Sequence, residues 1–455
     1  MRYVSTRGAT PALTFTEAVI TGLAPDGGLL VPAEIPNVAD KLHDWQELSF
    51  VALAKAVIAL FVDDIPPVQL AALIERAYED FDHPDVVAFK SLDVPAVEVL
   101  ELFYGPTLAF KDIALQLLGR FFEYILEAQD KHLNILGATS GDTGSAAIAG
   151  VRSLAAVDIF ILYPKGKVSP LQELQMTTVL DANVHCLAVA GSFDDCQTLM
   201  KAVFNDSTFK SEYSLGAINS VNWARVLAQI VYYGYASVQL GKAAPVTFCV
   251  PTGNFGNVFA GYLAKRMGFP IERLIVATNE NDILAVFFKT GRYQRSDVRY
   301  TVTPAMDIQV ASNFERYLYY HFDSDPQRLK AFMQAFADDG VASLAGEPED
   351  DILATAVNQT DTLETIRDTY HNCGYVVDPH TAIGIAAASR FPTTGPKVCI
   401  ATAHPAKFPE SVNKVIDARL ARHPSLDALE GLESRRLEVP ASAEAIKDVI
   451  RRYAR

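Results

Sequence analysis

Lys111 is the residue whose setting in the sequence best suits covalent chemistry. It lies in Phe103–Asp112, FYGPTLAFKD, where Gly105–Pro106 is a turn signal and Thr107 is a plausible N-cap of a helix that Leu108–Phe110 continue. A lysine in the first helical turn, beside apolar residues, can be a partly desolvated amine of the kind that Schiff-base chemistry requires. A surface lysine that lays its stem on apolar neighbours is the commoner alternative, and spacing alone favours that alternative.

A loop of small polar residues follows an apolar run in Leu133–Gly150, LNILGATSGDTGSAAIAG. Strand, loop and helix in this order present free backbone N–H groups to an anion, and Thr139, Ser140 and Thr143 add hydroxyl donors. The segment is not GxGxxG, and it lacks the Lys-Ser/Thr ending of a phosphate-binding NTPase loop. It predicts an anion site. The alternative is that Asp142 is the helix N-cap and that the glycines serve the turn.

A second unit of the same kind occupies Val246–Met267, VTFCVPTGNFGNVFAGYLAKRM. Gly253 and Gly256 allow the backbone to approach a ligand closely, while Asn254 and Asn257 can hydrogen-bond phosphate oxygens or cap the helix. Two such units favour a phosphorylated ligand more strongly than one does, although glycines in either loop can also serve packing alone.

The segment Asn219–Tyr233, NSVNWARVLAQIVYY, predicts an amphipathic helix with polar residues at its start. Asn219, Ser220 and Arg225 could gather an oxyanion, because an arginine offers a charge-assisted fork of donors. A capped helix with a surface arginine is an equally good interpretation of the spacing.

A histidine stands in the last polar segment of interest, Thr402–Phe408, TAHPAKF, which follows an apolar run. Ligands bind outside the carboxyl ends of parallel strands, so His404 is a candidate acid–base group. A lone loop histidine that precedes a proline is more often structural, and the sequence does not decide between the two.

Short apolar runs separated by helix-like stretches must position these segments. Runs of this kind fit strands covered on both faces, and their alternation with helices implies parallel α/β sheets. The first part of the chain differs, because Phe50–Phe61 and Val68–Tyr78 predict amphipathic helices. We therefore expect an α/β fold with an N-terminal domain, residues 1–95, and two parallel-sheet lobes, residues 96–220 and 221–455. The expected strands are Leu133–Leu136, Val157–Leu162, Val184–Val189, Val246–Val250, Leu274–Ala277 and Val398–Ala401.

Composition narrows the class of protein. The 455 residues exceed the ~250–300 at which single cores stop growing, and half of them are hydrophobic. A formal charge of −15 argues against nucleic-acid binding, and no apolar stretch has the ~18 residues needed to span a bilayer. Five scattered cysteines, none in a CxxC pair, and a first stretch without an apolar signal core make the cytoplasm the expected compartment.

Taken together, these segments resemble the threonine synthase family, within the tryptophan synthase β-like (fold type II) enzymes that use pyridoxal phosphate (PLP). The resemblance runs from Arg2 to Val412 and points to the longer, bacterial- and yeast-like branch. Its motifs, in order, are TRG, DGGLLVP, GPTLAFKD, ATSGDTG, LYPKGKVSPLQ, NSVNWAR, PTGNFGN, TNENDIL, PAMDI, VVDPHTA and TAHPAKF.

The resemblance implies a role for each matching residue. Lys111 corresponds to the lysine that holds PLP as a Schiff base, and Thr402 to the hydroxyl that contacts the pyridine nitrogen. The cradle of the cofactor phosphate corresponds to Gly253, Asn254, Phe255, Gly256 and Asn257. The loop around the substrate carboxylate and the cofactor ring corresponds to Thr139, Ser140, Asp142 and Thr143, and the substrate-phosphate site to Asn219, Ser220 and Arg225.

Asp142 departs from the wider fold type, in which many members carry asparagine beside the 3′ oxygen of the cofactor. A carboxylate close to a phenolate is repelled or holds a proton. We therefore expect Asp142 either to turn away as an N-cap or to be protonated.

The reaction that the resemblance implies is γ-elimination and β-hydration of O-phospho-L-homoserine, which gives L-threonine and phosphate. A threonine synthase-like phospholyase or a PLP-dependent dehydratase is the alternative within this chemistry. A regulatory or binding protein on a degenerate enzyme fold is disfavoured, because Lys111 and the glycine/asparagine loop are intact. The sequence leaves open whether the protein is a monomer or a homodimer, and no metal is expected.

Overall fold

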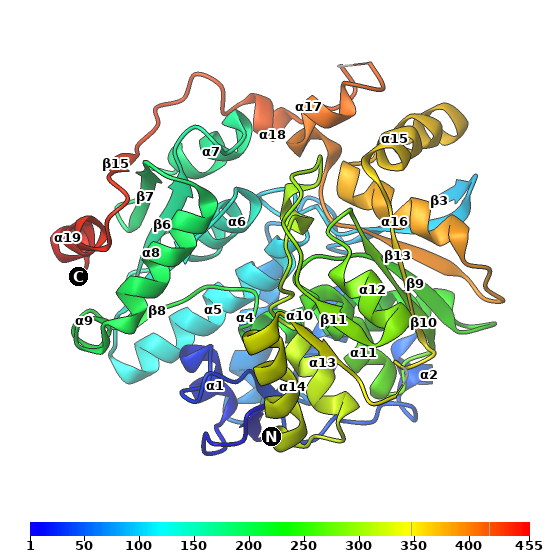
Figure 1. Cartoon of the computed structure of the whole chain (residues 1–455), viewed down its shortest axis with the longest axis horizontal. Helices are drawn as coiled ribbons and strands as arrows, with labels where there is room; N and C mark the ends of the chain where they lie inside the picture. Colours follow the sequence, from blue (N-terminus) through cyan, green and yellow to red (C-terminus); the bar gives the residue numbers. More distant parts are fainter. Residues whose placement is uncertain (347, 418) are drawn as a thin grey trace.

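Two parallel sheets, each in its own α/β lobe, form the framework of the computed structural model (Figure 1), which describes residues 1–346, 348–417 and 419–455. The larger sheet has the strand order β13-β10-β9-β14-β4-β3, parallel except for the hairpin pair β3 and β4. Its strands are β3 (Ala88–Asp93), β4 (Ala96–Glu101), β9 (Val246–Pro251), β10 (Ile271–Thr278), β13 (Ile352–Ala356) and β14 (Lys397–Ala401).

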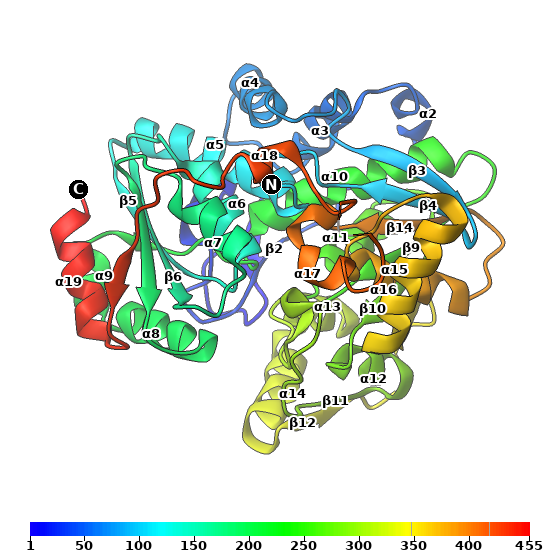
Figure 2. The ribbon, with the colours of Figure 1, turned by 90° about the horizontal axis from the view of Figure 1, so that it is seen from above.

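The smaller sheet has the order β15-β7-β6-β5-β8, and every pairing in it is parallel. Figure 2 shows it beside the larger sheet, with helices between them. Its strands are β5 (Leu133–Ala138), β6 (Val157–Pro164), β7 (Val184–Val189), β8 (Leu215–Gly216) and β15 (Leu437–Val439). The predicted α/β class and all six predicted strands are confirmed, because β5, β6, β7, β9, β10 and β14 cover the expected runs.

Helices cover both sheets. α16 packs on β14 and β9, α8 packs on β5 and β6, and α5 contacts both α6 and α10, which ties the lobes together. The helices are α1 (Phe15–Thr21), α2 (Leu42–Trp45), α3 (Phe50–Ile58), α4 (Pro67–Tyr78), α5 (Lys111–Gln129), α6 (Asp142–Val151), α7 (Pro170–Thr177), α8 (Phe193–Asn205), α9 (Ser207–Glu212), α10 (Trp223–Leu240), α11 (Gly256–Arg266), α12 (Ile283–Thr290), α13 (Phe314–His321), α14 (Pro326–Asp339), α15 (Gln359–Cys373), α16 (Pro379–Arg390), α17 (Pro409–Val412), α18 (Pro424–Asp427) and α19 (Ala443–Tyr453), with 3₁₀ turns η1 (Pro304–Met306) and η2 (Pro405–Lys407). Two small hairpin sheets pair β1 (Tyr3–Ser5) with β2 (Leu30–Pro32) and β11 (Arg292–Gln294) with β12 (Val341–Ser343).

The N-terminal helices do not have a hydrophobic core of their own. α3 and α4 pack on α10 and α5, and the ring of Tyr3 lies 5.6 Å from that of Trp223 at the start of α10. The expected boundary at residue 95 falls between β3 and β4. These two strands pair with each other, and β4 also pairs with β14, so both belong to the larger sheet. The division into residues 1–95, 96–220 and 221–455 stays a prediction.

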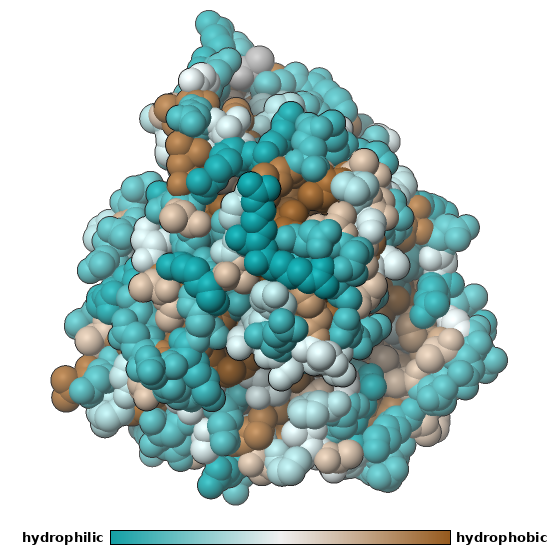
Figure 3. Space-filling model, turned by 90° about the vertical axis from the view of Figure 1, so that its left-hand side faces the viewer, coloured by the Kyte–Doolittle hydropathy of each residue, from teal (hydrophilic) through white to brown (hydrophobic). Residues whose placement is uncertain are grey.

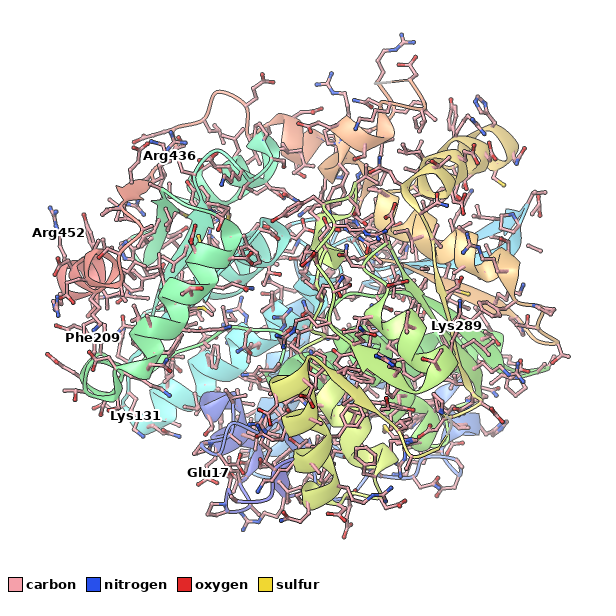
Figure 4. The ribbon with its side chains drawn as sticks, in the orientation of Figure 1. Glu17, Lys131, Phe209, Lys289, Arg436 and Arg452 are labelled. Atoms are coloured by element: carbon pink, nitrogen blue, oxygen red, sulfur yellow. The ribbon has the colours of Figure 1, made fainter. Side chains whose placement is uncertain are left out.

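The end of the chain returns to the smaller lobe. β15 pairs with β7, and Arg436 just before it binds Glu173 of α7 at 2.6 Å. Phe209 of α9 lies under α19, where the Lys447 amine and the Arg451 guanidinium are 5.3 and 5.4 Å from its ring (Figure 4). The face of the molecule on this side is mostly hydrophilic, with scattered apolar side chains (Figure 3), and α19 buries Ile446 and Ile450.

Within the described ranges, no helix has both the length and the apolar character that crossing a membrane requires.

Candidate active site

A short antiparallel contact places Lys111 beside the end of β14. Ala109 and Ala403 form an isolated bridge, in which the Phe110 N–H donates to the Thr402 carbonyl at 2.8 Å. Lys111 then begins α5, as expected for a lysine in the first turn, and its side chain is only 11% exposed. The surface-lysine alternative is therefore wrong.

Thr107 is not the N-cap of this helix. α5 begins later, after Phe110, and the Thr107 hydroxyl instead donates to the buried Asp112 carboxylate at 2.6 Å. The N–H of Thr107 donates to the same carboxylate at 2.9 Å, so Asp112 folds the turn back on itself. The turn holds the approach to Lys111 in one conformation.

Charge around Lys111 is unusually concentrated. The Lys111 amine lies 3.4 Å from Oδ2 of Asp142, and the amine of Lys407 lies 3.1 Å from Oδ1 of the same carboxylate. Burial lowers the pKa of Lys111, and although Asp142 opposes this shift, the net pKa is below that of a free lysine. The charges of Lys407 and Arg225 lower the pKa of Lys111 further. These are conditions that keep a buried amine reactive.

Asp142 is not an N-cap, so that expectation is wrong, and its cationic neighbours favour a carboxylate over the protonated acid. α6 has Gly141 as its N-cap, without a side-chain cap. Burial alone would raise the pKa of Asp142, but the Lys407 and Lys111 ammonium groups outweigh it and hold that pKa far below the usual range. Gln172 donates to Oδ1 at 2.9 Å, which completes the contacts that orient the carboxylate toward Lys111.

The rest of the loop after β5 divides into structural and accessible residues. The Thr139 hydroxyl accepts from the N–H groups of Gly141 at 3.0 Å and Gly144 at 2.9 Å, so it shapes the loop. Ser140 is exposed and Thr143 half-buried, which leaves both free to face a ligand.

The loop after β9 forms a tight cradle at the start of α11. Phe255 adopts a left-handed backbone conformation with φ 64°, and a Cβ on Gly253 would lie 2.8 Å from the Ala305 carbonyl oxygen. Asn254 accepts from the Ser312 hydroxyl at 3.1 Å. The Asn257 carbonyl oxygen accepts from two tyrosine hydroxyls of α10, while its buried Nδ2 has no hydrogen-bond partner in the described part of the chain.

The start of α10 adjoins this cradle. The Ser220 hydroxyl lies 2.9 Å from that of Ser312, which also contacts Asn254, whereas Asn219 accepts from the Val221 N–H at 3.2 Å. The prediction of an amphipathic helix in this segment is wrong. α10 begins at Trp223, and every residue from there to Val238 is buried, because the helix lies between the lobes.

Arg225 is the least satisfied charge of the site. It is 5% exposed, and its Nε and Nη1 find no hydrogen-bond partner among the residues described. Burial lowers the pKa of Arg225 to about 10, so the guanidinium is still charged at neutral pH. A buried, charged and unpaired guanidinium is costly unless an anion compensates it. The surface-arginine interpretation is wrong.

His404 lies two residues after Thr402 but faces a different space. Thr402 is 8% exposed and directly follows β14, whereas His404 lines a side cavity of about 360 Å³ together with Phe103 and Arg422. The ring of His404 accepts from the Ala406 N–H at 3.2 Å, and burial lowers the pKa of His404 to about 4. These contacts match the structural interpretation of His404.

His380, at the start of α16, was missed by sequence reasoning. Its Nδ1 lies 2.9 Å from Asp378, and its buried Nε2 has no hydrogen-bond partner within the described ranges. Thr381, its neighbour, accepts from the Thr402 N–H at 3.3 Å, and His380 contributes to the lowered pKa of Asp142. VVDPHTA contained the only signal: an aspartate two residues before the histidine.

The residues present fit PLP. A buried amine of lowered pKa, two orphaned buried donor groups and a loop that a Cβ would fill lie at the carboxyl ends of strands in two parallel sheets. These are the requirements of a cofactor that carries an aldehyde and a phosphate.

Fold and site thus define a PLP-dependent enzyme, and comparison with known proteins agrees. Residues 92–402 match the family described as pyridoxal-phosphate dependent enzyme, residues 2–78 the threonine synthase N terminus, and residues 381–450 the threonine synthase C-terminal family. The chain belongs to the threonine synthase family.

Individual relatives cover nearly the whole chain. Threonine synthase of Schizosaccharomyces pombe is 45% identical over 91% of this chain and 89% of its own length, and that of Pseudomonas aeruginosa is 45% identical over 94% and 92%. The crystal structure of PLP-bound threonine synthase from Brucella melitensis has a TM-score of 0.95 at 41% identity and covers 100% of both chains. The human protein named threonine synthase-like 2 is 39% identical over 90% of this chain and 88% of its own.

Proposed function

We propose that this chain converts O-phospho-L-homoserine and water to L-threonine and phosphate. The single observation that carries the proposal is Arg225, a buried guanidinium near the Lys111 amine whose Nε and Nη1 have no partner among the described residues. Such a group suits a dianionic phosphate, which accepts the paired N–H bonds of a guanidinium. Asn219 and Ser220 lie just before the same helix and would complete the phosphate site.

The cofactor would be held from both sides of the site. Lys111 would carry its aldehyde carbon, the Gly253–Asn257 loop its phosphate, and the Thr402 hydroxyl would meet its ring nitrogen. When bound, PLP supplies the electron sink that makes the bonds next to the substrate amine labile.

The protein's own groups would move the protons. With PLP bound and the substrate in place, the freed Lys111 amine would be neutral enough to take the proton from Cα of the substrate, because burial lowers its pKa. A second proton would leave Cβ, so that its electron pair forms the Cβ–Cγ double bond as phosphate departs. Arg225 would stabilise the charge that builds on the phosphate as its bond to Cγ breaks. A proton returned at Cγ, water added at Cβ and a proton returned at Cα would then complete threonine, and Lys111 is the amine that would carry protons to these carbons. Thr139 shapes the loop in which Ser140 and Thr143 would bind the substrate carboxylate.

Product analysis tests this proposal. The purified protein, loaded with PLP, is incubated with O-phospho-L-homoserine, and phosphate, threonine and keto acid are measured together. Matched release of phosphate and threonine is the expected result. Phosphate with a keto acid and ammonia would replace the proposal with a phospholyase or dehydratase. Lys111→Ala is expected to lose both the cofactor absorbance and turnover, and an undiminished rate would exclude Lys111 as the carrier.

We also propose that the protein works in the cytoplasm, which its unpaired cysteines support, since a reducing compartment keeps thiols free. Whether it acts as a monomer or a homodimer would follow from its mass in solution.

A further inference from the structure

Lys407 is the buried charge of the site that the proposed reaction leaves without a role. It belongs to the 3₁₀ turn η2 after β14, and its side chain is 0% exposed. Its amine donates to the Thr107 carbonyl oxygen at 2.6 Å and lies 3.1 Å from Oδ1 of Asp142. Burying a lysine is costly unless its charge is paired, so this position requires the carboxylate.

The carboxylate of Asp142 is shared between two amines. Oδ1 faces Lys407 and Gln172, and Oδ2 faces Lys111 at 3.4 Å. The contact to Lys407 is the shorter one, and Lys407 has a second bond that holds it in place whereas Lys111 does not. Lys407 therefore neutralises much of the charge that would otherwise stabilise an ammonium at Lys111.

We infer that Lys407 is a positioning residue that, through Asp142, keeps the Lys111 amine oriented and available in its neutral form. Asp142 alone would fix Lys111 as a tightly paired ammonium, which cannot attack a carbonyl carbon or accept a proton. Lys407 alone would repel Lys111. Together, Asp142 and Lys407 place a carboxylate beside Lys111, and Lys407 reduces how strongly that carboxylate stabilises the protonated form of Lys111.

Five charged or titratable groups, from five different elements, make up or face this cluster. Asp142 of α6, Lys407 of η2 and Arg225 of α10 act on Lys111, and His380 of α16 acts on Asp142. The fifth, the buried Asp112 of α5, interacts with Lys407 and is held by Thr107, so Asp142 is the acid that contacts Lys111 directly. Removing Lys407 leaves Asp142 to pair with Lys111 alone, so the protonated form of Lys111 gains stability.

The test reads the Lys111 amine directly in the full-length, cofactor-free protein. Acetylation by acetic anhydride is followed at Lys111 by mass spectrometry across a pH series. We expect Lys407→Met to raise the midpoint pH of labelling by on the order of one unit, Asp142→Asn to lower it, and Lys407→Arg to restore it to near the wild-type value. In the Asp142→Asn background, Lys407→Met is expected to have less than half of its effect.

An unshifted midpoint in a folded Lys407→Met protein would overturn the inference, as would an undiminished effect in the Asp142→Asn background. Should Lys407→Met fail to fold, Lys407→Gln retains a donor for the Thr107 carbonyl, removes the charge and carries the same expectation. Lys397, which binds the Ala388 carbonyl at 2.9 Å away from the site, gives the matched control, and Lys397→Met is expected to leave the midpoint unchanged.

This inference rests on the proposed function only in taking Lys111 as the reactive amine. The labelling midpoint needs neither substrate nor turnover, so a shifted midpoint without threonine formation would retain the inference and reject the proposed reaction. Threonine formation with an unshifted midpoint would do the reverse. In the loaded enzyme, Lys407→Met is expected to move the acid limb of the kcat profile to higher pH with little change in KM, whereas a purely structural role would lower kcat at every pH.

Discussion

Ala109 and Ala403 form an antiparallel bridge that joins the segment before Lys111 to the residue after Thr402. The His404 N–H donates to the Leu108 carbonyl at 3.0 Å on one side of it, and the Phe110 N–H donates to the Thr402 carbonyl at 2.8 Å on the other. These backbone hydrogen bonds hold Lys111 close to Thr402, although the two residues are far apart in the sequence.

The Arg225 side chain is expected to support catalysis while it lowers the stability of the substrate-free protein. Arg225→Met should lower kcat/KM for O-phospho-L-homoserine by on the order of 10²–10³-fold, because the phosphate loses its charged donors. The same change should raise the unfolding temperature of the substrate-free protein, since it removes a desolvated guanidinium with unpaired donors. Steady-state kinetics and thermal unfolding without phosphate check the two effects.

Arg316 offers the matched control. It is also buried, but its guanidinium donates to the carbonyls of Leu30 and Val221 and to the side-chain oxygen of Asn313. Arg316→Met should therefore destabilise the fold by at least about 2 kcal/mol, because it strands these acceptors. A lower unfolding temperature in Arg225→Met as well would contradict the interpretation of Arg225 as a buried charge that awaits an anion.

Gly253 is expected to control cofactor affinity. A methyl group there would lie 2.8 Å from the Ala305 carbonyl oxygen and 3.2 Å from the Met306 Cα, and both are backbone atoms that cannot rotate away. Gly253→Ala should weaken PLP binding about 10- to 100-fold, in line with the ~1–3 kcal/mol cost of overpacking. Equilibrium titration of the cofactor-free protein with PLP measures it.

The control for Gly253 is Gly137→Ala, in β5. Its added methyl group would meet the Ile161 Cδ1 at 3.1 Å, the end of a side chain that can adjust. We expect its PLP affinity to stay within a factor of about three of the wild type, since the strand lies outside the phosphate cradle. Equal losses in both variants would indicate a general effect of packing.

How far the sequence determined the structure depended on the kind of signal. Strands such as β6 and β9 were predictable because they are buried on both faces and read as continuous apolar runs. β15 is short and only partly buried, so its residues show no strand periodicity. It pairs with β7, which lies far away in the sequence, and local sequence could not predict that pairing. The length of α10 was missed for the opposite reason, since a helix buried all round has no polar face to reveal its period.

The same contrast applies to the site. The resemblance predicted roles for Lys111 and the Gly253–Asn257 loop, and these segments follow β4 and β9, the two strands that flank β14 in the larger sheet. It did not predict the contact between Asp142 and Lys407, which lowers the pKa of Asp142 and which only the fold creates. His380 was missed because its free Nε2 is a property of three-dimensional packing.

His404 is expected to make stability depend on pH. Burial lowers the pKa of His404 to about 4, so in the range between pH 6.5 and 4 the unfolded chain binds a proton that the folded chain does not. Stability is then fully present above pH 6.5 and falls as the pH drops toward 4, by at most about 1.4 kcal/mol per pH unit from this residue. His404→Asn, which retains an acceptor for the Ala406 N–H, should flatten that slope by about one proton.

Denaturant unfolding at a series of pH values between 4 and 7 measures this slope. His185, whose pKa burial also lowers to about 4, remains in the variant and should preserve a residual slope. A slope unchanged by His404→Asn would mean that His404 titrates normally in the folded protein.

Gly119 is expected to set the distance between α5 and α6, and so the placement of Lys111 and Asp142 at their first turns. A methyl group on Gly119 would overlap the Gly150 carbonyl oxygen, with the Gly150 carbonyl carbon at 2.8 Å, and α6 could relieve the clash only by moving away. Gly119→Ala should destabilise the protein by about 2 kcal/mol despite the better helix propensity of alanine. Because α6 carries Asp142, the displacement should also lower turnover, by more than the loss of folded protein explains. Denaturation midpoints and kcat per folded molecule measure the two effects, with the exposed Glu127→Ala on the same helix as the control, which is expected within about 0.5 kcal/mol of the wild type. Wild-type stability in Gly119→Ala would show that the two helices are not held at this contact.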